Sequence, residues 1–178
     1  MTYELIQSRV AYSGRAFSIR QDTIYLPDSR QATLDIVDHI GSVVILPVDN
    51  DGNILFVRQY RHATGKHLLE LPAGTLEKGE LPEECAHREI REETGMAARV
   101  LHNLGGFYLA PGYSTEYMHV FLATDLVDSP LTPDADEYLN LEKIPVSRAM
   151  AISGEGLLPD AKSLAALHLA RKHLEKWL

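Results

Sequence analysis

Three glutamates in the stretch 74–95 have the spacing that places carboxylates on one face of a helix. Glu89, Glu92 and Glu93 lie three and four residues apart, and residues at these separations are neighbours on a helix surface. Crowded carboxylates repel one another, and a divalent cation held among them removes that cost. Oxygen ligands suit Mg²⁺, Mn²⁺ or Ca²⁺ rather than zinc. Spacing alone would still favour a solvated acidic helix, so the surrounding residues decide between the two interpretations.

The surrounding residues form a longer pattern. It reads Gly, five residues, Glu, seven residues, then Arg-Glu-apolar-any-Glu-Glu-any-Gly-apolar. Seven fixed identities, each at a frequency of about 0.06–0.08, would coincide in this chain on the order of once in a million. The stretch reproduces the Nudix box, and the chain therefore resembles the Nudix hydrolases. The matching positions are Gly74, Glu80, Arg88, Glu89, Ile90, Glu92, Glu93, Gly95 and Met96.

The resemblance implies an α/β/α sandwich that cleaves nucleoside diphosphates linked to another group, with Mg²⁺ as the cofactor or Mn²⁺ in its place. Glu80 and Arg88 are then expected to support the metal ligands, and Arg88 and Glu92 to take part in catalysis. Glu92 either binds the metal or holds a metal-bound water. The full set of expected metal ligands is the Ala73 carbonyl and the carboxylates of Glu89, Glu92 and Glu93.

Similarity to the ADP-ribose pyrophosphatase branch of this family extends over roughly residues 10–170. It includes the "QYR" and "ELPAG" pieces, the "DAKSLAAL" segment, and a proline, Pro111, sixteen residues after the last glycine of the box. This resemblance implies hydrolysis of ADP-ribose to AMP and ribose 5-phosphate. Two alternatives stay open: a pyrophosphatase for GDP-mannose or another sugar nucleotide, and a non-catalytic Nudix domain that binds ADP-ribose as a regulator.

The same resemblance suggests which residues contact the substrate. Arg61 and Glu116 match positions that contact a phosphate or the terminal ribose, whereas Arg58 and Tyr113 fit a strand-surface charge and a packed ring equally well. The expected substrate-binding residues are Arg61, Glu116, Arg58, Glu70 and Pro111.

A general base must activate the attacking water. In the resembling branch it comes from a loop after the sheet, which here is "LTPDADEYLNL". We expect Glu137 to be the base, with Asp134 and Asp136 as alternatives, because this loop holds fewer glutamates than is usual in the family. A loop can also close over a bound substrate.

The composition narrows the class of protein. The 178 residues are sufficient for one domain with a sizeable core, and the net charge of −8 argues against nucleic acid or an acidic membrane as a partner. No apolar run is long enough to span a bilayer. The first fifteen residues lack the apolar core of a signal peptide, and Cys85 is the only cysteine. These features predict a cytoplasmic protein.

Strand and helix signals are mixed without a repeating strand–helix–strand order, which predicts an α+β fold. We expect short strands in residues 1–40, a hairpin at Asp51-Gly52, a helix over 82–94, and helices near 145–153 and 160–178. Residues 126–136 are expected to form a loop. Residues 1–40 are assigned to a small antiparallel sheet domain for dimerisation and substrate binding, and 41–178 to the Nudix domain. The resemblance further implies a homodimer that exchanges the N-terminal sheets.

Overall fold

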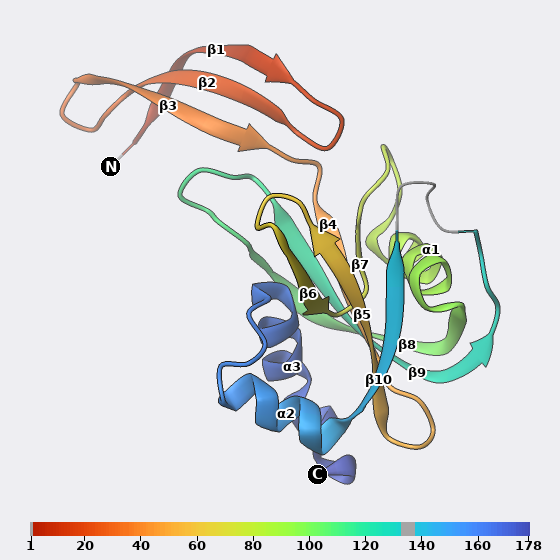
Figure 1. The fold of residues 1–178 in the computed structure, drawn as a ribbon. Coiled ribbons are helices and arrows are strands. Elements are labelled where there is room, and N and C mark those ends of the chain that lie inside the picture. The colour runs from red at the N-terminus through yellow and green to blue at the C-terminus, as the bar shows by residue number, and fades with distance from the viewer. Residues whose placement is uncertain (1, 133–137) are drawn as a thin grey trace. The chain divides into compact units, whose positions relative to one another are not determined.

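The computed structural model of the protein describes residues 2–132 and 138–178 (Figure 1). The chain divides into two units. The first consists of Met1–Gly41 with Phe107–Met118, and the second of Ser42–Gly106 with His119–Leu178. The box and both C-terminal helices belong to the second unit, which we call the catalytic unit after the role expected of the box, and the first is called the N-terminal unit.

The N-terminal unit is built on an antiparallel sheet in the order β1-β2-β3, formed by Glu4–Ser13, Ser18–Tyr25 and Gln31–Asp38. Ser29 has a φ of 65° in the turn between β2 and β3. The segment 107–118 joins this sheet through backbone hydrogen bonds. The Val37 N–H donates to the Tyr113 carbonyl at 2.8 Å, and the Thr115 N–H donates to the Val37 carbonyl at 3.0 Å.

Two sheets form the centre of the catalytic unit. One has the order β10-β5-β6 and the other β7-β4-β9-β8. Gly52, with a φ of 77°, lies in the predicted turn between β4 and β5. The strands are β4 Ser42–Pro47, β5 Asn53–Arg61, β6 Lys66–Glu70, β7 Ala73–Thr75, β8 Met96–Tyr108, β9 Tyr117–Asp128 and β10 Leu139–Pro145.

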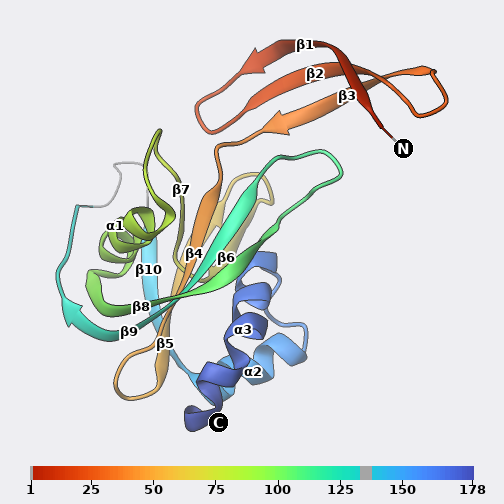
Figure 2. The same cartoon turned by 180° about the vertical axis from the view of Figure 1, so that it is seen from behind.

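Helices cover both sides of these strands. Helix α1 (Pro82–Thr94) lies on one side, and α2 (Val146–Gly154) and α3 (Ala161–Leu174) lie on the other, as both views show (Figures 1 and 2). A short 3-10 helix, η1 (Glu175–Trp177), follows α3. All six residues of β4 are buried, as expected for a strand with helices on both faces. Val43 and Ile45 pack with Cys85, Ala86 and Ile90 of α1 in one apolar core.

The expected α+β class, with an α/β/α sandwich and an N-terminal antiparallel sheet, is confirmed. Helix α1 has the predicted bounds. The loop predicted to begin at residue 126 was wrong at its start, because β9 continues to Asp128. No described helix combines the length and hydropathy needed to cross a membrane. Assigning dimerisation and substrate binding to the N-terminal unit remains a prediction.

Candidate active site

The box runs from the short strand β7 through a loop and helix α1 to the start of β8. The helix begins at Pro82, and the Glu84 side chain accepts a hydrogen bond from the Leu81 N–H at 3.0 Å. Such a bond satisfies one of the backbone donors left over at a helix start. The helix ends at Gly95, whose φ of 74° is the left-handed conformation that glycine adopts without strain. The hydrogen bond at Leu81 and the glycine at position 95 fix where α1 begins and ends, and thus where the glutamates of the box lie on the helix.

Arg88 organises the carboxylates of the box. Its Nε and Nη2 donate to the two oxygens of Glu80 at 2.9 and 3.0 Å, and its Nη1 donates to Glu89 at 2.6 Å and to Glu92 at 3.0 Å. Nη2 also donates to the Thr75 carbonyl at 3.3 Å. The hydrogen bond from Arg88 holds the pKa of Glu80 below its usual range, and Glu80 in turn raises the pKa of Arg88. One guanidinium thus fixes three of the four box carboxylates.

The remaining carboxylate is tied to β7. Glu93 accepts a hydrogen bond from the Ala73 N–H at 3.2 Å, and both Glu89 and Glu93 are buried. Gly74 leaves the space that Glu89 fills, because a Cβ at Gly74 would lie only 1.7 Å from Oε1 of Glu89. Glycine thus lets the backbone lie close to the Glu89 carboxylate in this position, and any larger residue would displace that carboxylate.

The box holds more negative than positive charge. Glu80, Glu89 and Glu92 contact Arg88, and Glu93 contacts the Ala73 N–H of β7, so these four carboxylates outnumber the one guanidinium. No group of three or more His, Cys, Asp or Glu side chains within 2–132 and 138–178 is arranged to hold a metal ion. Glu89 and Glu92 instead share one nitrogen of Arg88. The structure brings the predicted glutamates into one neighbourhood, and their role as metal ligands remains a prediction.

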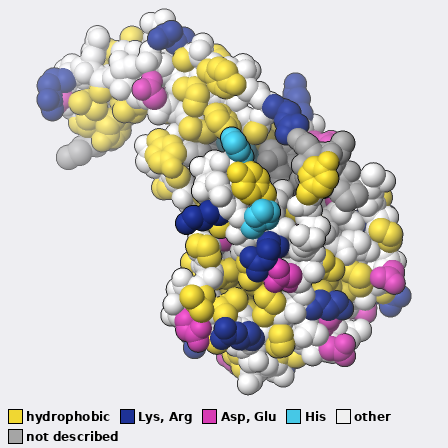
Figure 3. All heavy atoms as spheres, in the orientation of Figure 1, with side chains coloured by type: hydrophobic (Ala, Val, Ile, Leu, Met, Phe, Trp, Pro, Cys, Tyr) yellow, Lys and Arg dark blue, Asp and Glu magenta, His cyan; other side chains and the backbone are white. Residues whose placement is uncertain are grey.

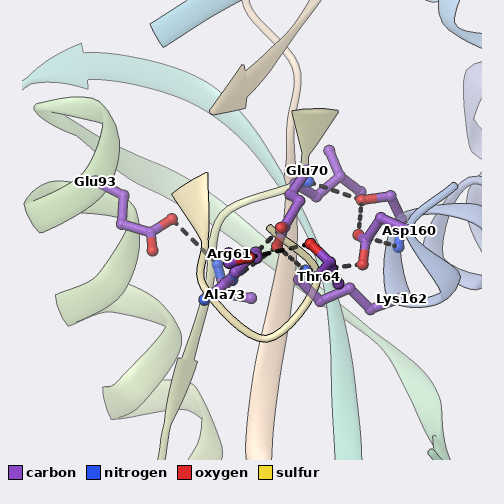
Figure 4. A network of polar contacts seen from close by, with 9 residues as sticks. Arg61, Thr64, Glu70, Ala73, Glu93, Asp160 and Lys162 are labelled. Carbon is purple, nitrogen blue, oxygen red and sulfur yellow. Dashed lines mark hydrogen bonds and ion pairs between the residues drawn. The ribbon is translucent and has the colours of Figure 1, made fainter. Parts of the chain in front are cut away.

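A second charged network lies on the other side of β7, at the ends of β5 and β6 (Figure 4). Glu70, only 1% exposed, accepts two hydrogen bonds from Arg61, from Nε at 2.9 Å and from Nη2 at 2.7 Å. The Lys162 Nζ donates to the same carboxylate. Burial alone would raise the pKa of Glu70, but the hydrogen bonds and charges of Arg61 and Lys162 outweigh it and lower that pKa.

Arg58 has a different partner from its strand neighbour Arg61. It donates from Nε to Glu142 of β10 at 2.5 Å and from Nη2 at 3.2 Å. More than a third of each side chain is exposed to solvent. Two of the predicted substrate-binding arginines, Arg58 and Arg61, are therefore each paired with a carboxylate, one at the surface and one against a buried partner.

Pro111, Tyr113 and Glu116 belong to the N-terminal unit, where they lie in the connection between β8 and β9. Pro111 and Tyr113 line a hollow of about 240 Å³ together with Leu34 and Ile36 of β3. The Glu116 carbonyl accepts a hydrogen bond from the Leu109 N–H at 3.1 Å, which links the two ends of this connection. Their contact with substrate stays a prediction, as does that of Arg61, Arg58 and Glu70.

The predicted general base, Glu137, lies outside the described residues. The same holds for its alternatives Asp134 and Asp136.

Comparison with known proteins places this architecture in a family. A family model for the NUDIX domain matches residues 38–163. The chain is 35% identical to an ADP-ribose pyrophosphatase of Bacillus subtilis over 158 residues, which cover 88% of this chain and 85% of that protein. The chain belongs to the Nudix family. The protein is therefore an enzyme, a Nudix hydrolase.

Two further similarities bear on fold and substrate. The Nudix chain is 32% identical to a GDP-mannose pyrophosphatase of Yersinia enterocolitica over 142 residues, covering 75% of this chain and 74% of that protein. A crystal structure of an ADP compounds hydrolase superimposes with a TM-score of 0.86 at 23% identity, covering 99% of this chain and 96% of the other. The structural likeness establishes the fold.

Sequence reasoning did not identify Lys162, Asp160 or Ser163 as part of the charged network around Glu70. Asp160 is the N-cap of α3 and accepts from the Ser163 N–H at 3.1 Å. The Ser163 Oγ accepts from the Leu71 N–H at 2.7 Å, next to Glu70. Asp160, Lys162 and Ser163 lie in the "DAKSLAAL" segment that resembles the ADP-ribose pyrophosphatase branch. The resemblance gave them no role, and nothing local connects Lys162 to a glutamate ninety-two residues earlier.

Proposed function

We propose that this protein hydrolyses the pyrophosphate bond of ADP-ribose with water, giving AMP and ribose 5-phosphate, and that it depends on Mg²⁺. The observation that carries this proposal is the box network, in which three carboxylates contact one guanidinium and a fourth contacts the backbone of β7. The naming of a relative that is 35% identical over 88% of this chain supports the choice of substrate.

The residues of the box suit a hard divalent cation. Their donors are carboxylate oxygens, which Mg²⁺ and Mn²⁺ prefer, and their excess negative charge favours a cation. The space at Gly74, which a Cβ would close, keeps the Glu89 carboxylate beside β7. Glu89, Glu93 and Glu92, with the Ala73 carbonyl, would hold the metal. When bound, Mg²⁺ supplies charge neutralisation of the phosphate oxygens and activation of water.

Side chains of the protein have separate tasks in this reaction. Arg88 and Glu80 orient the ligand carboxylates, since each oxygen of Glu80 already accepts from Arg88. Arg61 is proposed to bind a phosphate of the substrate through its partly exposed guanidinium. Glu137, or alternatively Asp134 or Asp136, is proposed to take the proton of the attacking water.

GDP-mannose is the second candidate substrate. The observation that favours it is the 32% identity to a GDP-mannose pyrophosphatase over 75% of this chain. The box performs the same phosphate chemistry in either case. Discrimination between adenine and guanine must therefore come from residues outside the box, where we propose Pro111 and Glu116 of the N-terminal unit as contributors.

We also propose that the protein forms a homodimer through exchanged N-terminal sheets. Hydrophobic side chains gather on the surface of this unit (Figure 3). All ten residues of β1 are exposed, and Leu5, Val10 and Tyr12 are 58%, 66% and 59% accessible. Exposed apolar side chains on an edge strand are a surface that another chain can cover. Light scattering of the purified protein tests this: a monomer at all concentrations would overturn it.

A substrate panel tests the activity. ADP-ribose, GDP-mannose, diadenosine polyphosphates and NADH are incubated with the enzyme, with and without Mg²⁺, and phosphate released by an added phosphatase is measured. Cleavage of the pyrophosphate bond exposes phosphomonoesters, so only hydrolysed substrate gives signal. We expect the largest kcat/KM for ADP-ribose and none without the metal. A higher value for GDP-mannose would assign the enzyme to that substrate, and no hydrolysis of any compound would overturn the proposal.

A further inference from the structure

Two buried charged residues from distant parts of the chain meet in the catalytic unit. Glu70 at the end of β6 is 1% exposed and Lys162 in the first turn of α3 is 9% exposed. Replacing a buried ion pair with apolar side chains is often neutral or even stabilising. The stability of the fold is therefore a weak explanation for why this buried pair is present. The pair also acts on the charged groups next to it.

The pair is part of a row of alternating charges (Figure 4). Asp160 accepts from the Lys162 Nζ at 3.0 Å, and Lys162 in turn donates to Glu70 Oε2. The same oxygen accepts from Arg61 Nη2 at 2.7 Å, and the other oxygen accepts from Arg61 Nε at 2.9 Å. The Glu70 carboxylate thus accepts hydrogen bonds from two cations, Arg61 of β5 and Lys162 of α3.

Helix α3 is anchored at the same place by its backbone and cap. The Ser163 Oγ donates to the Asp160 carboxylate at 2.5 Å and accepts from the Leu71 N–H at 2.7 Å. Leu71 follows Glu70 directly in the chain, so α3 fixes both the side chain of Glu70 and the backbone beside it. We call Asp160, Lys162 and Ser163 the α3 clamp.

The clamp leaves one edge of Arg61 available. Its hydrogen bonds to Glu70 use Nε and Nη2, and among the described residues no side chain or carbonyl accepts a hydrogen bond from Nη1. The Arg61 side chain is 41% exposed, against 2% for Glu70. The pKa of Arg61 is raised mainly by its hydrogen bond to Glu70. The negative charge of Glu93 in the box raises the same pKa further. The Arg61 guanidinium is therefore influenced by the charge of the box. Its orientation is set by Glu70, which Lys162 holds in turn.

We infer that Lys162 is a positioning residue: by holding Glu70, it fixes the Arg61 guanidinium with one edge directed to a phosphate of the substrate. This inference rests on the proposed function, since it takes Arg61 as a phosphate-binding group. A guanidinium held in its binding orientation loses less side-chain freedom when an anion binds. Lys162 would contribute to substrate affinity through two intermediate side chains and without touching the substrate.

Kinetics with ADP-ribose test the role. Lys162→Met keeps an unbranched side chain that is only one heavy atom shorter and removes the charge. We expect KM to rise about tenfold and kcat to change less than about threefold, because binding to a phosphate acts on ground state and transition state alike. Lys162→Arg should restore much of the KM. Lys143→Met is the matched control, since Lys143 pairs with Asp49 at the surface, and its KM should equal that of the wild type.

A double-mutant cycle separates positioning from general destabilisation. If Lys162 acts through Arg61, Lys162→Met should have no further effect on KM in an Arg61→Met background. Additive effects of the two substitutions would overturn the inference. A lowered melting temperature with unchanged KM would also overturn it, because it would show a purely structural role.

A measurement without substrate keeps this inference distinct from the proposed function. Hydrogen exchange of the Arg61 Nε–H with water can be followed by ¹⁵N NMR. We expect slow exchange in the wild type and at least tenfold faster exchange in Lys162→Met. If the wild type fails to hydrolyse ADP-ribose, the substrate proposal fails and exchange still decides whether Lys162 fixes Arg61. Equal exchange in both proteins would overturn the positioning role.

Discussion

Two arginines belong to two charged networks in the catalytic unit, and the networks differ in their balance of charge. Arg88 lies among Glu80, Glu89 and Glu92, with Glu93 beside them. Arg61 lies in a row in which each charge has an opposite neighbour, ending at Asp160. The first network has a surplus of carboxylates, and the second is neutral within itself.

This difference indicates what each network can do. Carboxylates in excess repel one another unless a cation joins them, so the box is suited to a divalent metal. A neutral row of alternating charges needs no external ion, and its members hold one another in place. The box network thus fits a ligand-binding role, and the Arg61 network fits the fixing of a side chain that meets an anion.

Glu93→Gln is expected to abolish nearly all turnover while the fold is kept. The amide has nearly the same shape, but it removes one of the charges that would hold a metal. We expect kcat for ADP-ribose to fall about a thousandfold at saturating Mg²⁺, the loss typical of removing an electrostatic contribution to catalysis. Circular dichroism should be unchanged. Glu83→Gln, on the exposed face of the same helix, is the control. Full Mg²⁺-dependent activity in Glu93→Gln would contradict the metal assignment.

Gly74→Ala tests the close approach of β7 to the Glu89 carboxylate. The added methyl would lie 1.7 Å from Oε1 of Glu89, so that carboxylate must move away from Arg88. We expect a 10- to 100-fold loss in kcat/KM, about the effect of disturbing the groups that orient metal ligands. Gly154→Ala is the control, because nothing lies within 4 Å of the position that its methyl would take. Activity equal to that control would show that the position of Glu89 is unimportant.

The box could be predicted from sequence because its determinants are local. Helix α1, its glycine stop and the shared face of Glu89, Glu92 and Glu93 follow from spacings of a few residues. The partners of Glu70 could not be predicted in the same way. Lys162 reaches it across ninety-two residues of chain, and that contact exists only after α3 packs against the sheet. The pairing of Arg58 with Glu142 depends likewise on strand register.

Glu70→Gln should weaken folding at neutral pH, because it leaves Arg61 and Lys162 near a neutral amide. Breaking a buried pair in this way typically costs about 3 kcal/mol. The pKa of Glu70 is lowered in the folded protein. Its contribution is therefore present above the unfolded pKa of about 4.3 and is lost as the pH falls through the lower folded value. Urea unfolding of both proteins should show their stabilities converging below about pH 4. A difference independent of pH would contradict this account.

Arg58 and Glu142 provide the smallest effect and the sharpest contrast with Arg61 and Glu70. Both pairs have two hydrogen bonds, but Glu142 is 36% exposed and Glu70 is 2% exposed. A double-mutant cycle with Arg58→Met and Glu142→Gln should give a coupling free energy below about 1 kcal/mol, as for other surface pairs. Since the partner is solvated and no clamp fixes it, Arg58→Met should raise KM for ADP-ribose less than about threefold, well below the effect of Arg61→Met. An equal rise for both variants would show that Arg58 also binds the substrate, and that a buried partner is not what selects the phosphate-binding arginine.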